Sequence, residues 1–180
     1  MAATNLVALI LGAGPRVGAS VAKELMRNGY VVAVVSRNGT NNKTEQGYLS
    51  LKADLSDVKD IPAIFGRVRE ELQAPPSVVV WNAGARTVPP VENNIFTISH
   101  ETLIRDLNVN TLGPFVAAQQ ALEAWKALPA GTKKTFIYTG NIMNVKVLPT
   151  AATLTLGMGK SATSFWINLA DASYKDEDVR

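Results

Sequence analysis

The chain has 180 residues, of which 47% are apolar and 18% charged, with a formal net charge of +3, one histidine and no cysteine. A domain of this size buries roughly 70% of the surface that its unfolded chain exposes, so it forms a packed core without a metal ion or a disulfide. The composition excludes disulfides, thiolate metal sites, a cysteine nucleophile and histidine-rich metal sites.

The chain also lacks the patterns of membrane and nucleic-acid-binding proteins. Its longest apolar runs, such as Leu6 to Leu11, fall far short of the roughly 20 residues that cross a bilayer. No basic segment precedes an apolar block at the N-terminus, and the lysines and arginines are scattered. We therefore expect one cytoplasmic domain over residues 1–180, with no membrane and no nucleic acid among its partners.

The first predicted elements alternate between strand and helix. Leu6 to Leu11 is a continuous apolar run, typical of a strand buried on both faces. From Val17 to Asn28 the apolar residues recur every fourth position, which predicts a helix. Tyr30 to Val35 is a second β-branched run, and the polar stretch from Asn38 to Gly47 is predicted to be a loop.

A second strand–helix–strand unit follows. Tyr48 to Leu51 is a short third strand. Ser56 is a plausible N-cap for a helix whose apolar residues run from Val58 to Leu72 along one face. After a Pro-Pro break, Val78 to Val80 forms a fourth strand.

The last part of the chain contains two long helical patterns around a fifth strand. Ser99 begins a helix that runs to about Leu128, and Gly113-Pro114 should bend it. Thr135 to Thr139 is the fifth strand, and Ala151 to about Tyr174 is the last helix.

This order predicts an α/β fold, a doubly wound parallel sheet of the Rossmann type. We expect about five strands in the order 3-2-1-4-5, with helices on both faces and right-handed crossovers. The fifth strand would be an open edge unless something covers it. In such folds, ligands bind at the carboxyl ends of the strands, where the strand order reverses.

A glycine-rich turn stands at that place. Gly12, Gly14 and Gly18 follow the first strand and lead into a helix. Gly12 permits a tight turn, Gly14 lets a pyrophosphate approach the backbone N–H groups, and Gly18 lets the helix pack closely on the sheet. The pattern favours a dinucleotide site over a purely structural turn.

The end of the second strand indicates which dinucleotide binds. An acidic residue there would select NAD, but this chain has Ser36-Arg37-Asn38. The Arg37 guanidinium can hold a ribose 2′-phosphate, and Arg16 in the glycine turn can add a second one. We therefore expect NADP more than NAD, the alternative being that both arginines are only solvated surface charges.

Together these residues resemble the short-chain dehydrogenase/reductase family over about Leu6 to Ala172. The resemblance rests on the following motifs: Gly12-x-Gly14-x-x-x-Gly18, Asp54-Leu55, Asn82-Ala83-Gly84, Asn110-x-x-Gly113 and Lys160.

The resemblance implies a role for each motif. The glycine turn, including Arg16 and Val17, would bind the cofactor. Asp54 and Leu55 would flank the adenine of that cofactor. The remaining implied site residues are Asn82, Ala83 and Gly84 beside the cofactor ribose, Asn110 holding a water in a proton relay, and Lys160 on the nicotinamide ribose, where it lowers the pKa of a catalytic tyrosine.

The chain departs from the family pattern in three respects. Leu156 stands four residues before Lys160, where the family has tyrosine. The family serine has no clean match, and Asn141 in Thr139-Gly140-Asn141 takes its place. The C-terminal substrate-binding segment of the family is expected to be absent.

Two functions follow as hypotheses. The chain is an NADP-dependent oxidoreductase that moves a hydride between nicotinamide and a small carbonyl or alcohol, with Asn110, Lys160 and either Asn141 or Tyr138 around the reacting oxygen. Alternatively it is an inactive NADP-binding module or sensor, because Leu156 cannot donate a proton. A homo-oligomer is expected in either case, and no metal site.

Overall fold

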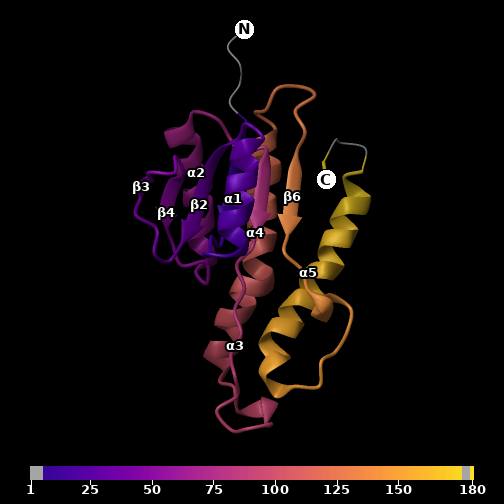
Figure 1. Ribbon diagram of the computed structural model, residues 1–180. Coiled ribbons are helices and arrows are strands. Elements are labelled where there is room, and N and C mark those ends of the chain that lie inside the picture. The colour runs from indigo at the N-terminus through magenta and orange to yellow at the C-terminus, as the bar shows by residue number, and fades with distance from the viewer. Residues whose placement is uncertain (1–5, 176–178) are drawn as a thin grey trace.

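The computed structural model describes residues 6–175 and 179–180. Its centre is a six-stranded sheet in the order β3-β4-β2-β1-β5-β6, whose strands are seen with their flanking helices in Figure 1. The strands are β1 (Val7–Leu11), β2 (Val31–Ser36), β3 (Asn42–Lys43), β4 (Leu49–Lys52), β5 (Val78–Trp81) and β6 (Thr135–Tyr138). The helices are α1 (Val17–Arg27), α2 (Ile61–Leu72), α3 (His100–Leu107), α4 (Gly113–Trp125) and α5 (Leu154–Ser173).

The parallel part of the sheet confirms the predicted strand order. β4, β2, β1, β5 and β6 are neighbours in that order and all pair in parallel. The stretch from Asn38 to Gly47, however, is not only loop, because β3 lies within it and pairs antiparallel with β4. Two polar residues at a sheet edge carry no apolar alternation, so the sequence pattern could not reveal this strand.

The core lies on both faces of the sheet. Successive side chains of a strand point to opposite faces. Val7, Leu9 and Leu11 of β1 pack in one cluster with residues of α2 and α4, whereas Ala8 and Ile10 pack in the other with residues of α1. All five β1 residues are completely buried, which explains why β1 reads as one continuous apolar run.

The long helix predicted from Ser99 is divided. Ser99 does cap α3, since its side chain accepts a hydrogen bond from the Thr102 N–H. A π-helical turn from Asn108 to Leu112 then separates α3 from α4, and Pro114 lies in the first turn of α4. Proline has no N–H for a helical hydrogen bond, so the helix adjusts in the turn just before it.

A second helix start also differs from the prediction. Ser56 is not the N-cap; the Asp57 side chain accepts from the Lys59 N–H and opens a short 3₁₀ turn ahead of α2. A Ser and an Asp one residue apart are both good caps by residue type, so the sequence alone could not choose between them.

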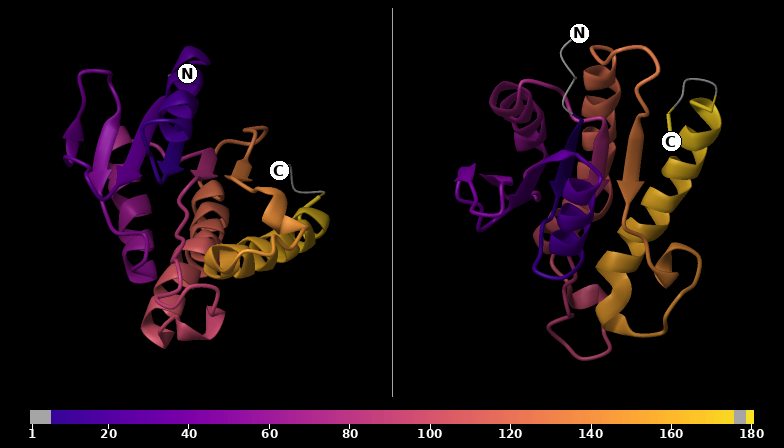
Figure 2. Two further views of the ribbon diagram at one scale, coloured as in Figure 1. Left: turned by 60° about the horizontal axis from the view of Figure 1, so that its bottom comes forward. Right: turned by 45° about the horizontal axis from the view of Figure 1, so that its top comes forward.

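α5 completes the molecule beside the pair formed by α3 and α4, as both views of Figure 2 show. It packs against α3 and the π-helical turn, and its Trp166 ring lies 5.4 Å from Phe115 of α4 and 6.4 Å from Phe136 of β6. The sheet edge at β6, which was expected to be open unless something covers it, is partly covered. Val179 forms a parallel bridge with Lys134 beside this strand. Among the described helices, none has the length and apolar character needed to cross a membrane.

Candidate functional site

The turn after β1 lies pressed against the loop after β5. Gly12 has φ +97°, and a Cβ there would lie 2.3 Å from the Ala83 nitrogen. The Asn82 Nδ2 group donates to the Gly12 carbonyl over 2.8 Å. Only glycine tolerates both this conformation and this contact, so Gly12 fixes the two loops together.

The other two glycines of the turn have different surroundings. A Cβ at Gly18 would lie 2.6 Å from Ala13 Cα, so Gly18 lets α1 start close under the turn. At Gly14 a Cβ would meet nothing within 4 Å. Gly14 is also exposed, three residues before α1 begins, so no side chain shields this part of the turn, although the Gly14 N–H donates to the Gly12 carbonyl over 3.0 Å.

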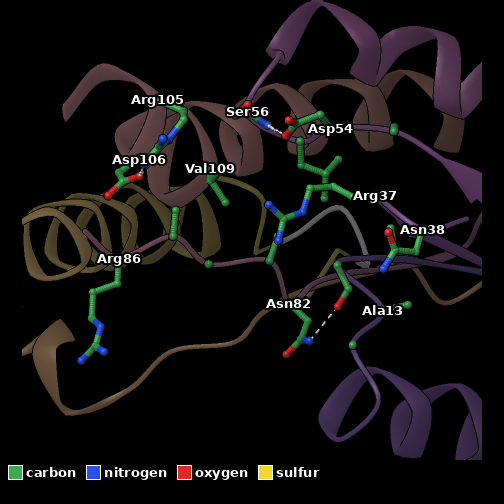
Figure 3. A pocket seen from close by; sticks show the side chains of 18 of the residues that line it. Ala13, Arg37, Asn38, Asp54, Ser56, Asn82, Arg86, Arg105, Asp106 and Val109 are labelled. Atoms are coloured by element: carbon green, nitrogen blue, oxygen red, sulfur yellow. Dashed lines mark hydrogen bonds and ion pairs between the residues drawn. The ribbon is translucent and has the colours of Figure 1, made fainter. Parts of the chain in front are cut away.

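A cleft of about 900 Å³ opens at the carboxyl ends of the strands (Figure 3). Gly14 and Pro15 lie at one wall, and Arg105 and Asp106 of α3 lie at another. Eight of the predicted cofactor residues line it: Gly12, Gly14, Arg37, Asp54, Leu55, Asn82, Ala83 and Gly84. The structure therefore brings together residues from four separate parts of the sequence.

The charged residues of this cleft include Arg37 and Asp54. In Figure 3 the Arg37 side chain extends from the end of β2 into the space between the walls. The Ser56 N–H donates to Asp54 Oδ1 over 3.0 Å. That bond is the main reason why the pKa of Asp54 lies below its ordinary value, and the charge of Arg37 lowers the pKa further.

Six of the predicted cofactor and catalytic residues lie outside the lining of the cleft, namely Arg16, Val17, Gly18, Asn110, Asn141 and Lys160. Arg16 and Val17 are exposed at the start of α1, and Gly18 is buried beneath the turn. Asn141 follows β6, and its Oδ1 accepts from the Met143 N–H over 2.9 Å, so that Asn141 caps a short 3₁₀ turn.

Asn110 is completely buried in the π-helical turn. Its Nδ2 donates to the Ala85 carbonyl over 2.7 Å, and its Oδ1 accepts from the Ala85 N–H over 2.9 Å. The same Nδ2 lies 3.3 Å from the Thr155 carbonyl. Asn110 thus joins the loop after β5 to the start of α5, beside the cleft rather than in it.

The carbonyl of Asn110 is engaged as well. The Tyr138 hydroxyl donates to it over 2.9 Å, and the Thr163 hydroxyl donates over 2.7 Å. Burial raises the pKa of Tyr138 to about 12. Tyr138 is therefore a neutral, hydrogen-bonded phenol at neutral pH.

Lys160 lies against the same tyrosine. Its Nζ donates to the Thr139 carbonyl and stands 4.2 Å from the centre of the Tyr138 ring. Burial lowers the pKa of Lys160 to about 8. One turn earlier in α5, Leu156 lies close to Gly84. A Cβ added to Gly84 would be 4.0 Å from Leu156 Cδ1. The position beside Lys160 and the cleft loop thus carries a hydrocarbon side chain.

Sequence reasoning missed a buried charge on the cleft wall. Asp106 is completely buried, and its Oδ1 accepts from Arg105 Nε and Nη2. Burial raises its pKa, but hydrogen bonds from Thr87 and Arg105 outweigh that effect, and the pKa ends below its ordinary value. One signal was available: Asp106 precedes Asn110 by four residues, which places both on one helix face.

Known proteins resemble this chain over most of its length. Residues 6–148 match the family model described as short chain dehydrogenase. The short chain dehydrogenase/reductase dmxR12 of a Cryptosporiopsis species is 37% identical over 178 residues, which is 93% of this chain and 71% of that relative. The chain spans about 45% of the length of several further curated relatives.

Solved structures share the fold. A 4-hydroxyisoleucine dehydrogenase complexed with NADH has a TM-score of 0.81 at 18% identity, over 98% of this chain and 72% of that one. A metagenomic short-chain oxidoreductase in complex with NADP has a TM-score of 0.78 at 21% identity, over 97% of this chain and 79% of that one. The neighbours thus include complexes with either nucleotide.

Proposed function

The chain belongs to the short-chain dehydrogenase/reductase family, and on that premise we propose that it binds NADP(H) in this cleft, as a single dinucleotide-binding domain. The observation that carries the proposal is Arg37, a cation at the end of β2 where an NAD-selective site has an acidic residue. A guanidinium there forms charge-assisted hydrogen bonds with a 2′-phosphate.

The other residues of the cleft fit the rest of such a cofactor. The open space at Gly14 and the N-terminus of α1 suit a diphosphate, because Gly14 carries no side chain to obstruct an anion and the helix dipole attracts one. Asn82 and Ala83 are held beside this turn by the contacts at Gly12. When bound, the nicotinamide supplies or accepts a hydride.

Turnover of a small carbonyl or alcohol is the second candidate function. Lys160 favours it, because a buried ammonium with a pKa of about 8 lies one turn after position 156. Against it, Leu156 donates no proton, and the Tyr138 hydroxyl already donates to the Asn110 carbonyl. We therefore propose cofactor binding without efficient turnover as the function that the residues support best.

The variant Arg37→Ala tests the choice of cofactor. Loss of a charge-assisted contact predicts that the Kd for NADPH rises by about tenfold to a hundredfold. The Kd for NADH should stay within about twofold, since NADH has no 2′-phosphate. Arg27→Ala is the matched control, because Arg27 is exposed on α1 and pairs with Glu24 away from the cleft. Equal losses for both nucleotides would refute this role of Arg37.

We also propose that the chain self-associates. Phe115 of α4, and Phe165 and Leu169 of α5, are 46%, 75% and 60% exposed. Exposed apolar side chains that gather on neighbouring helices are typical of interfaces between subunits. Sedimentation equilibrium should give at least twice the chain mass of 19.3 kDa, and a monomer at micromolar concentration would contradict the proposal.

A further inference from the structure

The segment that carries Arg37 folds back closely over β4. The Gly39 N–H donates to the Ser36 carbonyl over 3.1 Å. A Cβ at Gly39 would lie 2.0 Å from the Leu51 carbonyl oxygen, so this position accepts only glycine without a shift of the backbone. Two residues after Arg37, the main chain is therefore fixed against the end of β4.

Asn41 fixes the same segment a second time. Its backbone is left-handed, with φ 59°, a conformation that asparagine tolerates better than most residues. Its Oδ1 accepts from the Lys52 N–H over 2.9 Å and from Arg67 Nη1 over 3.0 Å. One side chain thus ties the connection between β2 and β3 to β4 and to α2.

The residue between these two anchors is also held. The Thr40 N–H donates to Ser50 Oγ over 3.2 Å, and Ser50 is buried in β4. Three successive residues therefore contact β4, whereas Arg37 and Asn38 at the start of the segment line the cleft. Neither Asn41 nor Arg67 lines it, so any effect of theirs on a bound nucleotide passes through the backbone.

We propose that Gly39 and Asn41 are positioning residues for cofactor selectivity, which hold the backbone of Arg37 where its guanidinium meets the 2′-phosphate. The proposal rests on the proposed function. An exposed loop that carries a binding residue must lose conformational freedom when the ligand binds. A loop that is already ordered has lost that freedom beforehand, so more of the contact energy appears as affinity.

Asn41→Ala tests the proposal, with Asn41→Asp as the conservative variant that keeps Oδ1 and tolerates the left-handed backbone. Freeing about one residue predicts that the Kd for NADPH rises about tenfold in Asn41→Ala. The Kd for NADH should stay within about twofold, and Asn41→Asp should restore tight NADPH binding. Gln46→Ala, a neutral exposed position in the same hairpin, should match the wild type.

A merely structural role would lower the thermal midpoint and weaken both nucleotides alike, and that result would overturn the proposal. Should Asn41→Ala fail to fold, Arg67→Ala decides instead, because it removes one of the two donors to Asn41 from an exposed helix face. It should weaken NADPH selectively by about threefold, and no selective loss would count against the proposal.

Titration of Arg37→Ala with both nucleotides, in parallel with Asn41→Ala, distinguishes failure of the positioning role from failure of the proposed function. A selective NADPH loss in Arg37→Ala without one in Asn41→Ala overturns the positioning role and leaves the proposed function standing. No selective loss in Arg37→Ala overturns both.

Discussion

At the scale of single residues, Leu156 separates binding from turnover. It stands one turn before Lys160 and close to Gly84 of the cleft. A phenol at this position would lie near a buried ammonium, which lowers a phenol pKa by its charge. The chain has the surroundings for such a group and lacks the group itself.

Leu156→Tyr should therefore raise NADPH-dependent reduction of a panel of small carbonyl compounds. A restored general acid contributes on the order of 10²-fold to 10⁴-fold in rate. Leu156→Phe is the matched control, because it adds the ring without the hydroxyl. Equal rates for the two variants, measured by NADPH absorbance, would show that the missing phenol is not what limits turnover.

Arg105 and Asp106 form the other residue-scale feature with a measurable consequence. Arg105→Ala leaves a completely buried carboxylate without its cation, which should lower the free energy of unfolding by about 2 kcal/mol at pH 7. Arg27→Ala breaks an exposed ion pair instead and should change the free energy of unfolding by less than about 0.5 kcal/mol.

The difference between wild type and Arg105→Ala should depend on pH. The folded-state pKa of Asp106 lies below the ordinary value of 3.8, so its contribution is present above that value and is lost as the pH falls through the folded pKa. Removal of Arg105 raises the folded pKa of Asp106, and the difference in unfolding free energy should narrow as the pH falls through the variant's folded pKa toward that of the wild type, which lies below 3.8. Urea unfolding across this range measures it, and a constant gap would contradict the assignment.

At the scale of elements, the turn between β1 and α1 was predictable from its glycines, although each glycine has a different structural role. Gly12 has a left-handed backbone and touches Ala83, whereas Gly14 meets nothing within 4 Å. A methyl group at Gly14 therefore disturbs no contact of the protein and obstructs only a ligand that approaches the backbone.

Gly14→Ala should leave the thermal midpoint within about 2 °C of the wild type, since exposed substitutions change stability little. It should weaken NADPH and NADH equally, by about tenfold or more, because the diphosphate is common to both. Gly29→Ala is a poor control, since Gly29 has φ +83°; Gly66→Ala in α2, with open space around it, is the better one. Tight binding by Gly14→Ala would place the diphosphate elsewhere.

The elements that sequence could not predict share a physical reason. β3 consists of two polar residues paired with β4 through backbone bonds, so no side-chain pattern marks it. The π-helical turn from Asn108 to Leu112 lies just before Pro114, so the sequence indicated a bend there but not its π-helical form. The buried strands and the amphipathic helices were predictable, because burial requires apolar residues at regular positions in the sequence.

The functional residues divide in the same way. Cleft residues near glycines or at strand ends, such as Arg37 and Asn82, could be predicted from local sequence. One hydrogen bond to the Asn110 carbonyl comes from Tyr138, which is 28 residues away in the sequence. The bond between Asn41 and Lys52 joins residues 11 apart. Such pairings arise only when the sheet assembles, so they remain invisible in the chain.

At the scale of the whole molecule, the parallel strands of one sheet place the glycine turn, Arg37 and the loop after β5 around a single cleft. Calorimetric titration of the wild-type chain with NADPH, and separately with NADH, tests this arrangement most directly. We predict saturable binding of both, with NADPH tighter by about tenfold or more. No binding heat and no rise in thermal midpoint with either nucleotide would contradict it.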